Sequence, residues 1–193
     1  MEARAIIVGL TGSIASGKSH VLELFAKEGI PTQSSDKIAH ELLDGGAFNE
    51  IAKEFPKSIV DGKVDRQLLG QEVFADNTKK QKLEKILHPM IRKRNIDFAN
   101  ISGAKFVVIE IPLLFESDAQ SYCDYTIVLN VSRETLQKRA LLREKMTLDK
   151  FERILNTQLP TEEKLLKADF IIDNEAEHDT VSQVKEIIRK INA

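Results

Sequence analysis

Eight consecutive residues near the start of the chain combine two glycines with a lysine and a serine at fixed spacing. They fit the pattern G-x-x-x-x-G-K-S and are Gly12, Ser13, Ile14, Ala15, Ser16, Gly17, Lys18 and Ser19. In such a phosphate-binding loop, or P-loop, backbone N–H groups face the β-phosphate and the following helix presents its positive end. The lysine reaches the β- and γ-phosphates, and the last hydroxyl binds Mg²⁺. The pattern therefore predicts binding of ATP and Mg²⁺, with Lys18 catalytic, Ser19 a metal ligand and His20 at the same nucleotide site.

The sequence around this loop alternates between strand and helix patterns. A short β-branched run precedes the loop, and residues 18–27 place apolar side chains at helical spacing after it. The strand candidates are residues 5–10, 106–111, 125–129 and 170–172, with a weaker one at 31–34. Apolar runs of this kind suit parallel strands that are covered on both faces. We therefore predict a three-layer α/β P-loop NTPase fold with a five-stranded parallel sheet.

The rest of the chain reads mainly as helix. Residues 49–102 look almost wholly helical, and Ser132 and Thr147 are positioned to cap later helices, the first of which would run through Arg143. We expect a single kinase domain over residues 1–193, with its core at about 1–48, 104–138 and 168–193. A helical substrate-binding insertion is expected at about 49–103, and a small helical lid at about 139–160.

Composition limits the classes of partner. The chain has 193 residues, 42% of them hydrophobic, and a net charge of -2, which gives no drive toward nucleic acid or membrane and favours a small charged substrate. Its single cysteine, Cys123, cannot form an internal disulfide. Because no signal-peptide layout or bilayer-length apolar run is seen, we expect a cytoplasmic protein. We also expect a monomer or a small homo-oligomer.

Two acids are placed where phosphoryl transfer would use them. Asp36 follows the second strand candidate, where a carboxylate could orient an acceptor hydroxyl or bind Mg²⁺, although it could equally be a helix cap. Glu110 lies near the end of the third strand candidate. An acid within a buried strand needs a partner, so we predict that Glu110 contacts Mg²⁺.

Two arginines form the cationic counterpart. Arg139 and Arg143 are four residues apart, so on one helix they would project from the same face toward the phosphates. The alternative is an ordinary solvated helix face. A lid that carries them would exclude water, which competes with the acceptor for the γ-phosphoryl group.

The P-loop alone does not distinguish kinases from GTPase switches or motor ATPases. The chain has no N-K-x-D sequence for reading guanine, and its small size, helical insertion and arginine pair favour a small-molecule kinase. Two alternatives stay open, namely a P-loop kinase acting on another small molecule or nucleotide, and a nucleotide-binding switch without catalysis.

Further segments arrive in an order that resembles dephospho-CoA kinases over essentially the whole chain. His88-Pro89-Met90-Ile91-Arg92 and Pro112-Leu113-Leu114-Phe115-Glu116 are the most specific of them. The others are Ser35-Asp36-Lys37-Ile38-Ala39-His40, Val64-Asp65-Arg66, Ala168-Asp169 and Asp173-Asn174. The resemblance implies transfer of the ATP γ-phosphate to the ribose 3′-hydroxyl of dephospho-CoA, the last step of coenzyme A synthesis.

The resemblance also implies roles for single residues. Asp36 and Arg139 would be catalytic, and Arg143 and Asn174 would lie at the ATP site, Asn174 near the adenine. The residues implied at the dephospho-CoA site are Asp36, His88, Arg92, Leu113, Leu114 and Glu116. Lys37, Arg66 and Gln158 are weaker candidates for a functional role.

This chain departs from the family pattern at three positions. The family usually has Asp-x-Asp where this chain has Ser34-Ser35-Asp36, so the first acid is missing. Either Asp36 serves alone, or little base is needed because positioning and charge neutralisation dominate phosphoryl transfer. Ser13 and Ala15 stand where the family commonly has glycine, at positions that the general P-loop pattern leaves free.

Overall fold

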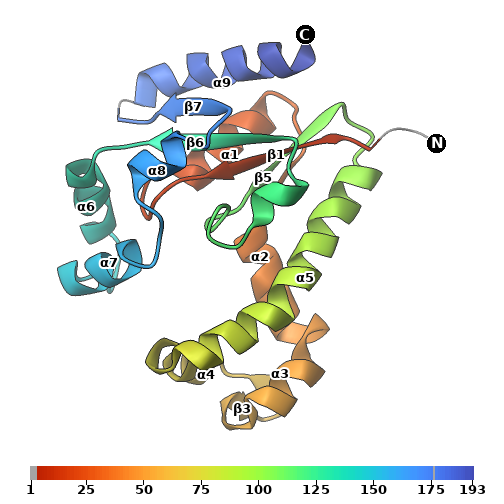
Figure 1. Cartoon of the computed structure of the whole chain (residues 1–193), viewed down its shortest axis with the longest axis vertical. Helices are drawn as coiled ribbons and strands as arrows, with labels where there is room; N and C mark the ends of the chain where they lie inside the picture. The colour runs from red at the N-terminus through yellow and green to blue at the C-terminus, as the bar shows by residue number, and fades with distance from the viewer. Residues whose placement is uncertain (1–3, 176) are drawn as a thin grey trace. The chain divides into compact units, whose positions relative to one another are not determined.

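Five parallel strands form one sheet in the computed structural model of the chain, which describes residues 4–175 and 177–193 (Figure 1). The strands are β1 (Ile6–Thr11), β2 (Thr32–Ser34), β5 (Phe106–Glu110), β6 (Tyr125–Asn130) and β7 (Phe170–Asp173). Their order across the sheet is β2-β5-β1-β6-β7, so the strand that leads into the P-loop is central. The predicted parallel sheet is therefore confirmed, while residues 1–3 of the predicted core lie outside the described residues.

The sheet is buried on both faces. One face meets α1 (Lys18–Lys27) and α9 (Glu177–Asn192), whose apolar residues share a core with Val8, Leu10 and Ile127 (Figure 1). Ile7 and Ile109, which the strand alternation directs to the other face, are also fully buried. Strands covered on both faces explain why their sequences read as continuous apolar runs.

Three further helices lie between β6 and β7 in the chain. They are α6 (Arg133–Leu141), α7 (Leu148–Leu155) and α8 (Thr161–Leu165), and a short 3₁₀ helix, Ala119–Tyr122, precedes β6. The predicted caps are present, since the Ser132 side chain accepts from the Thr135 N–H and the Thr147 side chain from the Lys150 N–H. The prediction that the first helix runs through Arg143 is wrong, because it ends at Leu141 and the Arg143 N–H turns back to the Ala140 carbonyl.

Residues 35–97 form a second compact unit with its own core. It contains α2 (Ser35–Glu41), a π-helical turn at Leu42–Gly46, α3 (Phe48–Glu54), a 3₁₀ turn at Pro56–Ser58, the strands β3 (Ile59–Val60) and β4 (Lys63–Val64), α4 (Arg66–Ala75) and most of α5 (Asn77–Ile101). Ile38 and Leu42 pack with Ile51, Phe55 and Leu87. The residues that follow Ser34 therefore belong to the helical unit by packing.

A β-hairpin interrupts the segment that was predicted to be almost wholly helical. Ile59 pairs with Val64 and Val60 with Lys63 in antiparallel fashion. Asp61 and Gly62 join the strands with φ angles of 50° and 72°. An Asp-Gly pair between apolar residues is typical of such a two-residue turn, so the sequence held a signal that the helical reading overlooked.

The single cysteine is a packing residue. Cys123 Sγ would lie 2.9 Å from a Cβ placed on Gly9, so this glycine leaves the room that the sulfur occupies. Burial raises the pKa of the Cys123 thiol to about 12. The thiol is therefore protonated and unreactive at neutral pH.

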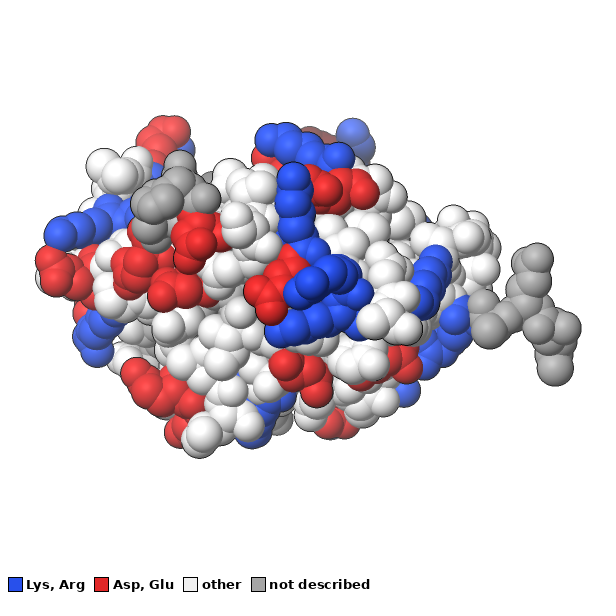
Figure 2. All heavy atoms as spheres, turned by 90° about the horizontal axis from the view of Figure 1, so that it is seen from above, with Lys and Arg blue, Asp and Glu red and all other residues white. Residues whose placement is uncertain are grey.

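Charged side chains of both signs are interspersed on the face that Figure 2 shows. On α9, for example, Lys190 pairs with Glu186 at 2.8 Å. Lys185 of the same helix pairs at 3.5 Å with Glu28, the residue that caps the C-terminal end of α1. Such exposed pairs add little stability individually. Within the described residues, no helix is both long enough and apolar enough to span a membrane.

Candidate active site

The P-loop joins β1 to α1 through two residues with left-handed backbone. Ala15 has a φ angle of 62° and Gly17 a φ angle of 92°. The Lys18 ammonium group bends back over the loop, donating to the Gly12 carbonyl at 2.9 Å and to the Ser13 carbonyl at 3.1 Å. The loop is thus closed on itself, with its lysine already directed to the place where phosphates are expected.

Both motif glycines are required by close contacts. A Cβ on Gly12 would lie 2.6 Å from Ser16 Oγ, and a Cβ on Gly17 would lie 2.4 Å from Asn174 Nδ2. Ser16 Oγ is buried and makes no hydrogen bond to any described residue. A buried hydroxyl without a partner, on a loop whose glycines leave no room for side chains, fits a site where phosphate oxygens supply the missing hydrogen bonds.

Asn174 connects the P-loop to α9. Its Nδ2 donates to the Ser16 carbonyl at 2.7 Å, and its Oδ1 accepts from the Thr180 hydroxyl at 2.8 Å. The residue is only 2% exposed. Its amide therefore holds the loop, and the predicted position near the adenine stays a prediction.

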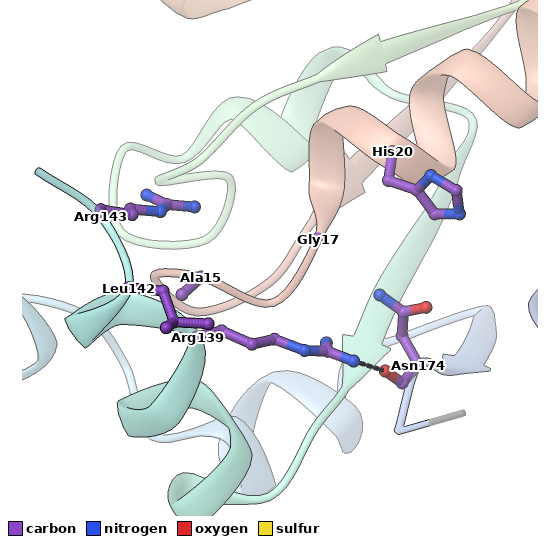
Figure 3. Close-up of a pocket in the computed structure, with 7 residues that line it drawn as sticks. All are labelled: Ala15, Gly17, His20, Arg139, Leu142, Arg143 and Asn174. Atoms are coloured by element: carbon purple, nitrogen blue, oxygen red, sulfur yellow. Dashed lines mark hydrogen bonds between the residues drawn. The ribbon is translucent and has the colours of Figure 1, made fainter. Parts of the chain in front are cut away.

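A cavity of about 280 Å³ lies beside the P-loop (Figure 3). Its lining residues come from the loop, the start of α1, the end of α6 and the segment after β7, and they are Ala15, Gly17, His20, Arg139, Leu142, Arg143 and Asn174. Of the residues predicted at the nucleotide site, the structure thus brings His20, both arginines and Asn174 together. Arg143 lines the cavity although it lies beyond the end of α6.

The Arg139 side chain runs along this cavity toward Asn174 (Figure 3). It donates to the Asn174 carbonyl at 2.9 Å and to the Glu175 carbonyl at 3.4 Å. The Glu175 carboxylate in turn accepts a short hydrogen bond from the Ser132 N–H at the start of α6. Hydrogen bonds from Ser132 and Thr135 hold the pKa of Glu175 below its usual value. These contacts tie both ends of α6 to the segment that follows β7.

Oxygen donors for a magnesium ion lie on α1 and β5. Ser19 is exposed in the first turn of α1. Glu110 is buried at the end of β5, in register with Leu10 of β1 and Ser34 of β2. A hydroxyl and a carboxylate are hard oxygen ligands and fit Mg²⁺, which takes few ligands from the protein and the rest from phosphates and water. Within residues 4–175 and 177–193, no three acidic, histidine or cysteine side chains form a metal cluster by themselves.

The loop after β5 carries three residues predicted to contact the acceptor. The Thr11 hydroxyl donates to the Pro112 carbonyl at 3.2 Å and so ties this loop to the end of β1. Leu114 is fully buried and lies 3.0 Å from a Cβ placed on Gly9, so it acts through the shape of the loop, while Leu113 is half-buried. Glu116 contacts two groups inside the protein, the Leu159 N–H and the Lys164 ammonium.

The remaining predicted acceptor residues lie in the second unit. Asp36 is exposed in the first turn of α2. Arg92 is exposed and His88 half-buried on α5, four residues apart and therefore on one face. The buried Asn95 of the same helix donates to Ser35 Oγ at 3.1 Å, which fixes the start of α2 next to Asp36. Their roles toward a substrate stay predictions.

Two residues that contact or support the P-loop were not identified from the sequence. The Thr161 and Ser13 hydroxyls share a hydrogen bond of 3.0 Å, and Lys164 is a fully buried lysine. Neither residue lies in a motif, and buried lysines are rare enough that burial is not expected from the residue type. Gln158, considered only a weaker candidate, accepts from the Ile14 N–H at 3.0 Å.

The sheet order, the complete P-loop between β1 and α1, and the arginine-lined cavity together define the class of small P-loop kinases. The family model for dephospho-CoA kinase matches residues 6–180. A dephospho-CoA kinase of Rhodopseudomonas palustris is 40% identical over 187 residues, covering 95% of this chain and 94% of the relative. The chain belongs to the dephospho-CoA kinase family.

Two solved structures are similar to the chain over nearly its whole length. The dephospho-CoA kinase from Campylobacter jejuni is 36% identical with a TM-score of 0.72, and 96% of each chain is covered. A Thermus thermophilus protein gives a TM-score of 0.90 at 28% identity, with 97% of this chain and 98% of that chain covered. The family consists of transferases that phosphorylate dephospho-CoA with ATP.

Replacing Gly17 with alanine should disable the nucleotide site. The new Cβ would lie 2.4 Å from Asn174 Nδ2 on a backbone with a φ angle of 92°, and left-handed strain alone costs about 1–3 kcal/mol. We expect Gly17→Ala to lower the melting temperature and to abolish measurable Mg-ADP binding in calorimetry.

Gly29→Ala is the matched control. Gly29 has a similar φ angle of 82°, but a Cβ there meets nothing within 4 Å. It should show a comparable loss of stability from the backbone and unchanged Mg-ADP affinity. Normal nucleotide binding by Gly17→Ala would contradict the geometry described for the loop.

Proposed function

We propose that this chain transfers the γ-phosphate of ATP to the ribose 3′-hydroxyl of dephospho-CoA, yielding coenzyme A and ADP, with Mg²⁺ as the required metal. The observation that carries the proposal is the P-loop, whose buried Ser16 hydroxyl lacks a partner and whose Lys18 is folded over it. Family membership supports the acceptor.

The P-loop and α1 supply the nucleotide half of the reaction. The P-loop N–H groups that are not bonded within the protein and the positive end of α1 hold the phosphates, and Lys18 leaves the Gly12 and Ser13 carbonyls to reach the β- and γ-phosphate oxygens. Ser19, with Glu110 and Asp36, would hold Mg²⁺, which when bound neutralises charge on the phosphates. In-line transfer then depends mainly on positioning and charge.

Asp36 is our candidate for orienting the acceptor. It follows the last residue of β2 by two positions and has an exposed carboxylate. Ser34 occupies the place of the first acid of the family pattern, so Asp36 must accept or orient the hydroxyl proton alone. His88, Arg92 and Leu113 complete the proposed acceptor site. Leu114, which is fully buried, and Glu116, which contacts Leu159 and Lys164, would support this site from inside the protein.

Arg139 and Arg143 are the proposed lid cations. Both line the cavity beside the P-loop, and Arg139 is held there through carbonyl oxygens rather than by a carboxylate. The Glu175 carboxylate interacts with it electrostatically, and a phosphate would be a stronger hydrogen-bond acceptor for the guanidinium than the carbonyl oxygens are. Residues 139–160 would then act as the lid that excludes water.

We also propose a cytoplasmic enzyme that acts on a small molecule rather than on nucleic acid. A net charge of -2 gives no overall drive toward a polyanion, and the face that Figure 2 shows carries acidic as well as basic side chains. The single, half-buried Cys123 is suited to a reducing compartment.

A coupled ADP-release assay with Mg-ATP and dephospho-CoA tests the function. Mass spectrometry should find one added phosphate on dephospho-CoA, and nucleosides or shikimate-like alcohols offered as acceptors should give no product. Lys18→Ala should lower kcat by about a hundredfold or more because it removes the cation on the phosphates. If the wild-type protein gave no phosphorylated product, the assignment of dephospho-CoA as the acceptor would be wrong, but the assignment of the nucleotide site would stand.

Asp36→Asn tests the proposed base. If the carboxylate takes the acceptor proton, kcat should fall by about a hundredfold or more while the KM for ATP changes little. Asp97→Asn, which removes an exposed acid paired with Lys93 on α5, is the control and should retain wild-type turnover. Near-normal turnover by Asp36→Asn at saturating substrates would exclude a base role.

A further inference from the structure

Residues 158–161 contact the first half of the P-loop from the side of α8. Gln158 Oε1 accepts from the Ile14 N–H at 3.0 Å, and the Thr161 hydroxyl shares a hydrogen bond of 3.0 Å with the Ser13 hydroxyl. Ser13 is 2% and Ile14 9% exposed. Each of these two adjacent loop residues therefore has one hydrogen bond from outside the loop.

The two anchored residues come directly before a strained position. Ala15 has a φ angle of 62°, a conformation that a residue with a Cβ disfavours. A buried N–H such as that of Ile14 is also unfavourable without an acceptor. Gln158 and Thr161 thus form hydrogen bonds with the two loop residues that precede the left-handed Ala15. Because the Ile14 N–H is bonded to Gln158, it is not available to a phosphate.

A buried ion pair holds the anchoring segment. Glu116 Oε1 accepts from the Leu159 N–H at 2.8 Å and lies 3.0 Å from the Lys164 ammonium, whose side chain is fully buried. A buried lysine charge persists only with a close counter-charge. Because Leu159 lies between Gln158 and Thr161, this pair fixes the backbone that carries both anchors.

We propose that Gln158 and Thr161 are positioning residues for the nucleotide phosphates, acting through Ile14 and Ser13, and that Glu116, with its charge balanced by Lys164, holds them in place. The inference rests on the nucleotide half of the proposed function and is independent of the acceptor. It predicts that nucleotide affinity depends on residues more than 140 positions away from the P-loop in the chain.

The direct test is the double variant Gln158→Met/Thr161→Val, which keeps side-chain size but removes both hydrogen bonds. Calorimetry with Mg-ADP should show binding weakened about tenfold, as expected for two lost hydrogen bonds. The KM for ATP should rise in parallel while the KM for dephospho-CoA stays within about twofold, a split that a general loss of stability does not produce. Thr161→Ser, which keeps the hydroxyl, should bind Mg-ADP like the wild type.

Ala15→Gly, added to the double variant, tests whether the anchors act through the strained residue. Glycine adopts a positive φ angle freely, so the anchors become less necessary and most of the lost Mg-ADP affinity should return. A folded double variant with wild-type Mg-ADP affinity would overturn the proposal. If Ala15→Gly restored no Mg-ADP affinity, the claim that Gln158 and Thr161 support the left-handed backbone at Ala15 would be wrong.

Two variants without unpaired buried charges test Glu116. Glu116→Gln/Lys164→Met keeps an acceptor for the Leu159 N–H, whereas Glu116→Leu/Lys164→Met removes it. Replacing a buried ion pair as a whole is often tolerated, so both proteins should fold. The leucine variant should bind Mg-ADP several-fold more weakly than the glutamine variant, by the loss of one hydrogen bond. Equal affinities would overturn the role of Glu116.

Failure of this inference is distinguishable from failure of the proposed function, because Mg-ADP binding requires no acceptor. A wild-type protein that binds Mg-ADP without phosphorylating dephospho-CoA contradicts the acceptor assignment only. Unchanged Mg-ADP affinity in the folded variants contradicts the positioning role only.

Discussion

The turn of the chain from β1 into α1 is the constraint on which the other features of the site depend. Within a few residues the backbone adopts left-handed conformations at Ala15 and Gly17, and a Cβ at Gly17 would lie 2.4 Å from the Asn174 amide. Such a backbone persists only where its surroundings over-determine it. Here the supports come from segments far away in the sequence, with Asn174 on one side and Gln158 with Thr161 on the other.

The order of the strands places the P-loop at the centre of the sheet, where a ligand site is expected. Because β1 lies between β5 and β6, the P-loop leaves the sheet at its centre, and Leu10, Glu110 and Ser34 share one register at the carboxyl ends of three strands. Ligands of open parallel sheets bind at such carboxyl ends. The helical unit of residues 35–97 has a separate apolar core, so its acidic and basic candidates can vary without disturbing the sheet.

Local patterns were sufficient to predict the P-loop, the five strands and the caps at Ser132 and Thr147, because each depends on residues close in sequence. The hairpin at Ile59–Val64 was missed because helical periodicity was extended over its Asp-Gly turn. The end of α6 at Leu141 was also misjudged. The hydrogen bond from Ile14 to Gln158 and the burial of Lys164 arise from tertiary contacts, for which the sequence carries no local signal.

The P-loop is built around a β-phosphate, and a comparison of two ligands of the unmodified protein can show this. Calorimetric titration with Mg-ADP and with AMP isolates that phosphate, since the two share the adenosine and α-phosphate. We expect Mg-ADP to bind at least about a hundredfold more tightly than AMP, because charge-assisted hydrogen bonds to the β-phosphate dominate the affinity. Equal affinities for Mg-ADP and AMP would contradict it.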